Sequence, residues 1–155
     1  MTEPWNKERG QELIQAHRHA AGATLPILHA MQEAFGCVPE EAIPLIADAL
    51  NLSHAEVYGI VSFYRDFRSK PPGRHVLKLC RAEACQAMGG DALAVAAEAK
   101  LSTHVGDASG NGTVTLEPVY CLGLCACAPA ALFDGKPFGR LNRERLEQLL
   151  DGTVR

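Results

Sequence analysis

The fold of this chain is decided by the stretch HVLKLCRAEAC, residues 75–85. Its first half alternates apolar and polar side chains, which is typical of a strand with one buried face. The alternation ends at Cys80, and a second cysteine follows at Cys85, so the two form a C-x4-C pair. Later in the chain Cys121 and Cys125 form a C-x3-C pair, shortly after a second short apolar run. Both pairs therefore fall where a predicted strand gives way to a loop.

Bulk composition narrows the class of protein. The chain has 155 residues, of which 47% are hydrophobic, and this is enough for a packed core. A formal net charge of -3 does not favour nucleic acid or an anionic membrane surface as a partner. Residues 1–10 lack the apolar core of a secretory signal, and no apolar run approaches the roughly 20 residues of a membrane helix. We expect a cytoplasmic protein without direct membrane insertion.

The six cysteines carry a further implication in such a compartment. Thiols there stay reduced, so a cysteine-rich chain points toward metal or redox chemistry rather than structural disulfides.

Residues 1–70 are predicted to form a helical segment. Four helices are expected: from Asn6 as N-cap to near Gly22, from Thr24 to just before Gly36, within Glu40–Leu50, and from Ser53 onward. Ser53 and Glu56 match a capping box, and Val57 and Tyr64 are among the residues expected on one apolar face of the last helix. Pro44 predicts a tight or separate first turn in the third helix.

Residues 74–155 are predicted to form a separate β-α-β-β-α domain after the break at residues 70–73, KPPG. The expected elements are a strand ending at Cys80, a helix over Asp91–Lys100, a strand over Thr113–Leu116, a hairpin turning at Asp134-Gly135, and a last helix capped by Asn142. The predicted fold class is therefore α+β, with a helical N-terminal segment before a mixed domain.

Four thiolates in two pairs are the donor set of an iron–sulfur cluster, and this is the favoured interpretation of Cys80, Cys85, Cys121 and Cys125. Zinc is an alternative, although its sites more often use C-x2-C spacing. A plant-type ferredoxin would need a third cysteine where Met88 stands, so that class is excluded. The C-x-x-C of a thioredoxin-type dithiol is absent as well.

Two other patterns are less informative. Residues 49–57 resemble a helix-turn-helix, but the second helix would open with His54, Ala55 and Glu56, which does not favour DNA binding.

Cys127 lies two residues after Cys125 and is an alternative ligand, although a spectator thiol is the simpler interpretation.

Some residues are interpreted as structural. Cys37 is expected to be a small core residue, and the six histidines show no ligand spacing.

The positive end of the helix at Asp91–Lys100, preceded by Gly89 and Gly90, is expected to face the cluster.

The cysteine pattern, followed by Ala128-Pro129, resembles that of the [2Fe–2S] thioredoxin-like ferredoxins, the 24 kDa or E-type subunits of NADH-quinone oxidoreductase. The stretches LPILHA at 25–30, FGCVP at 35–39 and EVYGIVSFY at 56–64 are similar to the N-terminal segment of that family. Within the family, CRAEACQAMG at 80–89 looks most like the gamma subunit of soluble, molybdenum-containing, NAD-dependent formate dehydrogenase.

This resemblance implies a thioredoxin-like domain over 74–155 and a partner-docking role for residues 1–70. It implies one [2Fe–2S] cluster per chain, held by the four paired cysteines, in an electron-transfer subunit without a substrate site of its own. The cluster would exchange single electrons with the FMN of an NAD-binding flavoprotein subunit, so FMN and NAD would belong to the partner. A molybdenum-containing catalytic subunit would complete a formate dehydrogenase. The alternatives are NADH-quinone oxidoreductase and an NAD-linked hydrogenase.

Residues near the cysteines invite finer hypotheses. Arg81 and Glu83 lie inside the first ligand loop and would either tune the cluster potential, meet the partner or remain solvated. Leu122, Leu124 and Phe133 would form an apolar docking rim or pack in the core.

Overall fold

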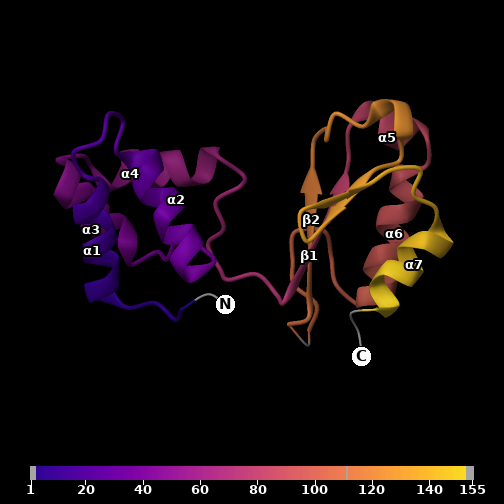
Figure 1. The fold of residues 1–155 in the computed structure, drawn as a ribbon, viewed down its shortest axis with the longest axis horizontal. Coiled ribbons are helices and arrows are strands. Elements are labelled where there is room, and N and C mark those ends of the chain that lie inside the picture. Colours follow the sequence, from indigo (N-terminus) through magenta and orange to yellow (C-terminus); the bar gives the residue numbers. More distant parts are fainter. Residues whose placement is uncertain (1–2, 111, 153–155) are drawn as a thin grey trace. The chain divides into compact units, whose positions relative to one another are not determined.

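The computed structural model describes residues 3–110 and 112–152. The chain divides into two compact units, Met1–Pro71 and Pro72–Arg155, which are coloured indigo to magenta and magenta to yellow in Figure 1. Each unit encloses a hydrophobic cluster of its own.

The first unit is helical. It contains α1 (Lys7–His17), α2 (Thr24–Phe35), α3 (Ala42–Leu50) and α4 (His54–Phe63). The predicted caps are present: the Asn6 side chain accepts from the Arg9 N–H, and Gly36 ends α2 with a φ of 77°. Ser53 and Glu56 form the complete capping box that opens α4.

The core of this unit gathers along α2 and α3. Its fully buried side chains include Ile27, Met31, Phe35 and Ile46, and Trp5 packs edge-on against Phe35 with ring centroids 5.0 Å apart. Cys37 is buried, as predicted, and burial raises the pKa of its thiol, with a smaller contribution from the charge of Glu41.

The helices of this unit differ in part from their predictions. The first helix was expected to reach Gly22 but ends at His17, where the chain leaves the helix through a turn in which the Ala20 N–H donates to the His17 carbonyl. The tight turn expected near Pro44 is present, because Ala42 and Ile43 donate to carbonyls three residues back. The apolar face predicted for α4 is wrong in part: Val57 is buried, but Tyr64 is 44% exposed.

The second unit contains a four-stranded sheet. In chain order its elements are β1 (His75–Cys80), α5 (Glu83–Ala87), α6 (Gly90–Leu101), β2 (Val114–Val119), the 3₁₀ turn η1 (Cys125–Cys127), β3 (Ala131–Phe133), β4 (Lys136–Phe138) and α7 (Arg143–Asp151). The strand order is β2-β1-β3-β4, with β1 parallel to β2 and antiparallel to β3. The hairpin predicted at Asp134-Gly135 joins β3 to β4.

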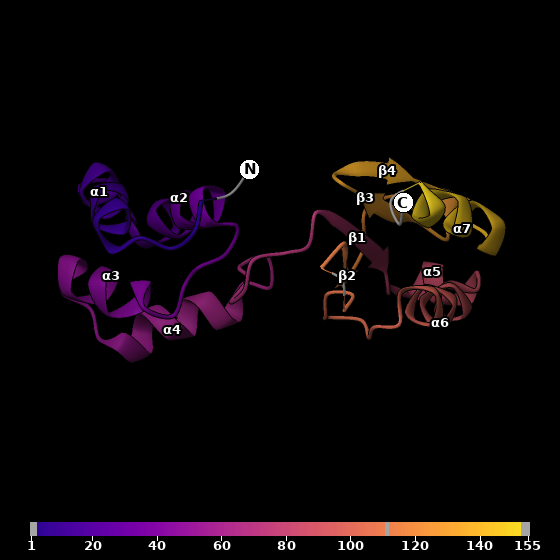
Figure 2. The ribbon, with the colours of Figure 1, turned by 90° about the horizontal axis from the view of Figure 1, so that it is seen from below.

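The core of this unit lies between the sheet and two helices. Figures 1 and 2 show α6 and α7 on the same side of the sheet, and Leu93, Ala97, Leu146 and Leu150 from these helices pack with Leu77 and other residues of the strands. The predicted α+β class is confirmed. None of the helices in the part of the chain described here is long and apolar enough to span a bilayer.

Two elements were not predicted, and both contain cysteines. The helix α5 spans only five residues, which is too short for apolar periodicity to reveal it. The η1 turn spans three residues. The second predicted strand is also longer than expected, because it continues through Pro118 to Val119 and pairs there with Cys80.

Candidate functional site

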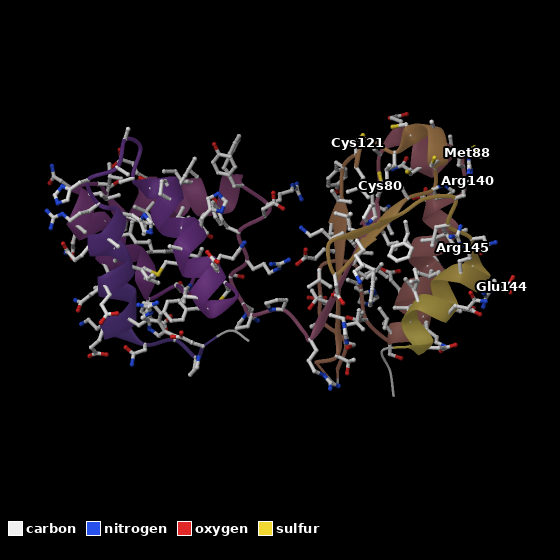
Figure 3. All side chains as sticks on the ribbon, in the orientation of Figure 1. Cys80, Met88, Cys121, Arg140, Glu144 and Arg145 are labelled. Carbon is white, nitrogen blue, oxygen red and sulfur yellow. The ribbon has the colours of Figure 1, made fainter. Side chains whose placement is uncertain are left out.

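The four paired cysteines lie at four different places in the second unit. Cys80 is the last residue of β1 and Cys85 lies in α5, while Cys121 follows β2 and Cys125 opens η1. Since β1 and β2 are parallel, both lead toward the same end of the sheet. Figure 3 shows Cys80 and Cys121 together at that end.

The structure brings all four thiols together, as two interacting pairs. The Cys80 and Cys85 thiols share a hydrogen bond, and the Sγ atoms of Cys121 and Cys125 are 3.7 Å apart. The pairs also interact with each other, because the charge of Cys80 acts on Cys125 and the charge of Cys125 acts on Cys85. The assignment of these four residues as the ligands of one site stays a prediction.

The two pairs differ in burial. Cys80 and Cys85 are 5% and 1% exposed, whereas Cys121 and Cys125 are exposed. The buried pair forms a small apolar cluster with Ala130.

Burial and backbone N–H groups act in opposite directions on the pKa values of the buried pair. Burial opposes ionisation of Cys80, but N–H groups of Ala82, Cys121 and Leu122 and the thiol of Cys85 outweigh it, so the pKa of Cys80 is lowered. Burial raises the pKa of Cys85, and its hydrogen bond to Cys80 acts in the same direction. The same hydrogen bond between the two thiols thus acts on their pKa values in opposite directions.

In the exposed pair, the hydrogen bond to Cys121 raises the pKa of Cys125, and the charge of Cys121 adds to the effect. The Gly123 N–H donates to the Cys121 Sγ at 3.4 Å. Metal binding requires these thiols in the thiolate form, so binding of a metal at either pair would be coupled to release of thiol protons.

The loop around the exposed pair depends on unusual backbone angles. Cys121 has a φ of 85° and Gly123 has a φ of 74°. A positive φ of this size is uncommon for a residue with a Cβ, such as cysteine. The conformation presents the N–H groups of Cys121 and Leu122 to Cys80, which links the two loops.

The expected orientation of the α6 N-terminus toward the cluster stays a prediction, because the N–H groups found to act on the Cys80 and Cys85 thiols belong to other segments. Those donors come from Ala82, which precedes α5, from the 121–122 loop, and from the Ala130 N–H, which acts on Cys85. The first turn of α6 instead packs on the first loop: a Cβ on Gly90 would lie 2.6 Å from the Cys85 carbonyl oxygen. Gly90 does permit a close approach, but to the backbone of that loop.

Ala130 was not among the residues singled out from the sequence, although it serves both buried cysteines. Its carbonyl accepts from the Cys80 N–H at 3.1 Å, while its own N–H acts on the Cys85 thiol. No side-chain signal identifies such a residue, because only its backbone is used.

The apolar residues near the second pair have separate roles. Leu122 and Leu124 are half-buried and pack on the cluster that contains Cys80 and Cys85. Phe133 packs against the main core of the unit and stacks on His75, so it is not part of a rim around the thiols.

Cys127 is the last residue of η1 and is half-buried. Gly139 packs against it, since a Cβ there would be 2.8 Å from the Cys127 Cβ. Cys127 lines a cavity of about 330 Å³ together with Arg140 and Arg145, which Figure 3 places toward α7. The interpretation of Cys127 as a spectator thiol stays a prediction.

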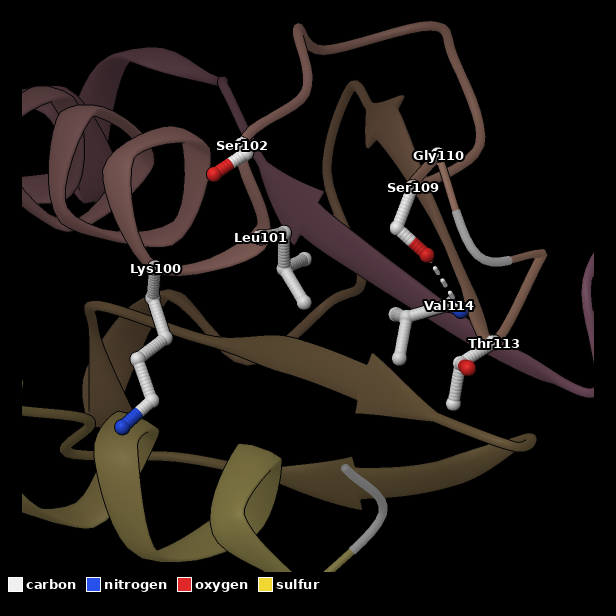
Figure 4. A pocket seen from close by; sticks show the side chains of 7 residues that line it. All are labelled: Lys100, Leu101, Ser102, Ser109, Gly110, Thr113 and Val114. Carbon is white, nitrogen blue, oxygen red and sulfur yellow. Dashed lines mark hydrogen bonds between the residues drawn. The ribbon is translucent and has the colours of Figure 1, made fainter. Parts of the chain in front are cut away.

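A second cavity of about 330 Å³ lies at the other end of β2 (Figure 4). Lys100 and Ser109 are among its lining residues, but Lys100 is paired with Asp151 at 2.6 Å and the Ser109 Oγ accepts from the Val114 N–H. In the described ranges, no three His, Cys, Asp or Glu side chains converge to hold a single metal ion.

Comparison with known proteins gives a consistent result. The family model for the thioredoxin-like [2Fe-2S] ferredoxins matches residues 10–153. The chain is 30% identical over 139 residues to the HndA subunit of the NADP-reducing hydrogenase of Solidesulfovibrio fructosivorans, covering 90% of this chain and 81% of the relative. It is 33% identical over 129 residues to the E-type subunit of the NADH-quinone oxidoreductase of Escherichia coli K12, covering 83% and 78%.

Among solved structures, an NAD+-reducing [NiFe]-hydrogenase in its air-oxidized state is similar, with a TM-score of 0.67 and 26% identity. The match covers 81% of this chain but only 22% of the hydrogenase chain, so it concerns one part of that larger protein. It agrees with the predicted thioredoxin-like α+β fold.

Proposed function

Since this chain belongs to the thioredoxin-like [2Fe–2S] ferredoxin family, we propose that it is an electron-transfer subunit whose Cys80, Cys85, Cys121 and Cys125 hold one [2Fe–2S] cluster. The observation that carries this assignment is the meeting of two thiol pairs at one end of a sheet. When bound, such a cluster supplies reversible one-electron chemistry.

The donor set fits this group. Each iron of a binuclear cluster takes two protein ligands, and the thiols of this chain lie in two pairs, Cys80 with Cys85 and Cys121 with Cys125. The thiolates also need hydrogen-bond donors, and the backbone N–H groups of Ala82, Leu122 and Ala130 are in place for Cys80 and Cys85. These donors are fixed by the fold, so they stabilise negative charge without reorganising.

The relatives support two kinds of parent complex. They are subunits of an NADP-reducing hydrogenase and of NADH-quinone oxidoreductases, and a similar solved structure is an NAD+-reducing hydrogenase. We therefore assign this chain to an NAD(P)-linked complex of one of these two kinds, beside a subunit that binds FMN and NAD. The finer assignment to formate dehydrogenase, with a molybdenum-containing subunit, draws no support from these relatives.

In this arrangement the helical unit is a docking element, and the thiol-bearing end of the second unit faces the electron donor. Two exposed thiols at that end support the orientation, because a buried site would lengthen the path for the electron.

The first experiment measures iron, zinc and acid-labile sulfide in anaerobically purified protein, with EPR before and after dithionite. We expect about two irons and two sulfides per chain and an S = 1/2 signal only on reduction. Cys125→Ser is expected to lose this signal, while the matched variant Cys127→Ser keeps it. Stoichiometric zinc that persists after iron–sulfur reconstitution would instead indicate a zinc-stabilised binding module.

The partner is tested separately. A tagged chain isolated from its host under mild conditions is expected to bring with it a flavin-containing subunit, and NADH or NADPH should then produce the reduced EPR signal. A chain that carries its cluster but recovers no flavoprotein would contradict the partner assignment and leave the cluster assignment intact.

A further inference from the structure

Arg81 occupies an unusual place, because it separates Cys80 from the loop that leads to Cys85. Its backbone is held on two sides: the Arg81 N–H donates to the Val119 carbonyl at 2.8 Å, and its own carbonyl accepts from the Gln86 Nε2 at 2.8 Å. Arg81 therefore joins the end of β2 to α5. Its backbone cannot move far without disturbing the first ligand loop.

The guanidinium of Arg81 is held in turn by α6. Its Nη2 lies 3.0 Å from the Asp91 Oδ1, in the first turn of that helix. Asp91 adjoins Gly90, which packs on the Cys85 carbonyl. The Arg81 side chain is 29% exposed and that of Asp91 is 61% exposed, so water screens the carboxylate more than the guanidinium.

One atom of this guanidinium has no acceptor. The Arg81 Nε is buried and lacks a hydrogen-bond partner within residues 3–110 and 112–152. A buried donor without an acceptor destabilises the folded protein, and the penalty is larger for a charged group. Packing of the loop therefore does not explain an arginine here, whereas an anionic group held by the neighbouring thiolates would be stabilised by it.

We infer that the positive charge of Arg81 raises the reduction potential of the four-thiolate site. Asp91 is the positioning residue, because it orients the Arg81 guanidinium. The inference rests on the proposed function. Reduction adds one electron to the site and breaks no bond, so the site gains one negative charge. Arg81 directly follows Cys80 in the chain, and a cation there that water screens only in part stabilises that added charge.

The test is an EPR-monitored redox titration with iron and sulfide content measured for each variant. Arg81→Gln is expected to lower the equilibrium constant for one-electron reduction about tenfold, which corresponds to a midpoint potential lower by about 59 mV. Asp91→Asn keeps an oxygen that accepts from Arg81 but removes a negative charge, so its potential should rise by the equivalent of about twofold to threefold.

The matched control is Arg74→Gln. Arg74 is exposed, lies at the opposite end of β1, and is roughly 20 Å from Arg81 at the usual rise per strand residue. Arg74→Gln removes the same charge as Arg81→Gln and should change the equilibrium constant for one-electron reduction by less than about twofold. Equal shifts in Arg81→Gln and Arg74→Gln would mean that only net charge matters and would overturn the inference.

Arg81→Gln and Asp91→Asn are both needed, because one of them could fail to fold or to retain iron. If Arg81→Gln fails to retain iron, the opposite shift in Asp91→Asn still decides the matter, and a potential that falls or stays unchanged there counts against the inference. Wild-type protein without a reducible two-iron signal would refute the proposed function itself. Wild-type protein with that signal but unshifted variants would refute only the role of Arg81.

Discussion

The two cysteine pairs differ in how the fold holds them. Cys80 and Cys85 are buried at the end of a strand and in a short helix, and backbone donors from three segments of the chain act on their thiols. Cys121 and Cys125 are exposed on a loop whose backbone enters the left-handed region. The first pair is enclosed by apolar neighbours, whereas the second pair is presented to the surroundings.

In the proposed electron-transfer site, this difference assigns a separate task to each pair. A buried pair provides a rigid anchor and a low dielectric, which strengthens the effect of nearby charges. An exposed pair leaves the site open to a redox partner. The buried pair and the exposed pair should therefore differ in thiol reactivity and in their contribution to stability.

The largest expected difference is in chemical reactivity. In metal-free, reduced protein, iodoacetamide should modify Cys121 and Cys125 at least about a hundredfold faster than Cys80 and Cys85, because the buried thiols react only after local opening. Mass spectrometry of digested samples over time measures the four rates. Similar rates for all four would show that the first pair is not held in the core when metal is absent.

The glycines beside the two pairs should differ in what they tolerate. Gly90→Ala is expected to lower the free energy of unfolding by about 2–3 kcal/mol, because the new Cβ would lie 2.6 Å from the Cys85 carbonyl oxygen. Gly123→Ala meets no atom within 4 Å, so only its φ of 74° opposes the change, at about 1 kcal/mol. Urea unfolding of the metal-free proteins measures both, and a larger effect at Gly123 would contradict the comparison.

Serine replacements should separate ligation from packing. Cys85→Ser places a hydroxyl in a buried site and is expected to lower the stability of the metal-free protein by about 1–2 kcal/mol. Cys121→Ser, at an exposed position, should change it by less than about 0.5 kcal/mol. Both variants should nevertheless lose the cluster. A Cys85→Ser protein as stable as the wild type would show that burial of this thiol contributes nothing.

The smallest effect concerns the hairpin that supports the first pair. The Asp134 Oδ2 lies 2.7 Å from the His75 Nδ1, and its Oδ1 accepts from the Val76 N–H. Burial opposes ionisation, but these partners and the charge of Lys136 outweigh it, so the pKa of Asp134 is lowered. A carboxylate with a lowered pKa stabilises the fold above its unfolded-state pKa of about 3.9, and that contribution is lost as pH falls through the folded value.

Asp134→Asn should therefore be less stable than the wild type at pH 6 by less than about 1 kcal/mol, and the difference should vanish toward about pH 2. Thermal unfolding of both proteins across this range provides the measurement. A difference that grows in acid would have the wrong sign for this ion pair.

Regular elements with local signals were predicted well from the sequence. The strand before Cys80, the capped helix at Ser53 and the turn at Asp134-Gly135 appear where expected, because caps, turns and alternation act over a few neighbouring residues. The end of the first helix and the exposed side of α4 were predicted incorrectly, because packing rather than local preference decides them.

The sequence by itself determined the family of this protein and the two cysteine pairs on which the proposed cluster site rests. Only the tertiary structure decided which backbone atoms act on the thiols, that Gly90 of α6 packs on the Cys85 carbonyl, and that Cys127 lines a cavity with Arg140 and Arg145. Ligand identity depends on the kinds of side chains and their spacing. The groups around each ligand come from segments far apart in the chain, and only the folded protein brings those together.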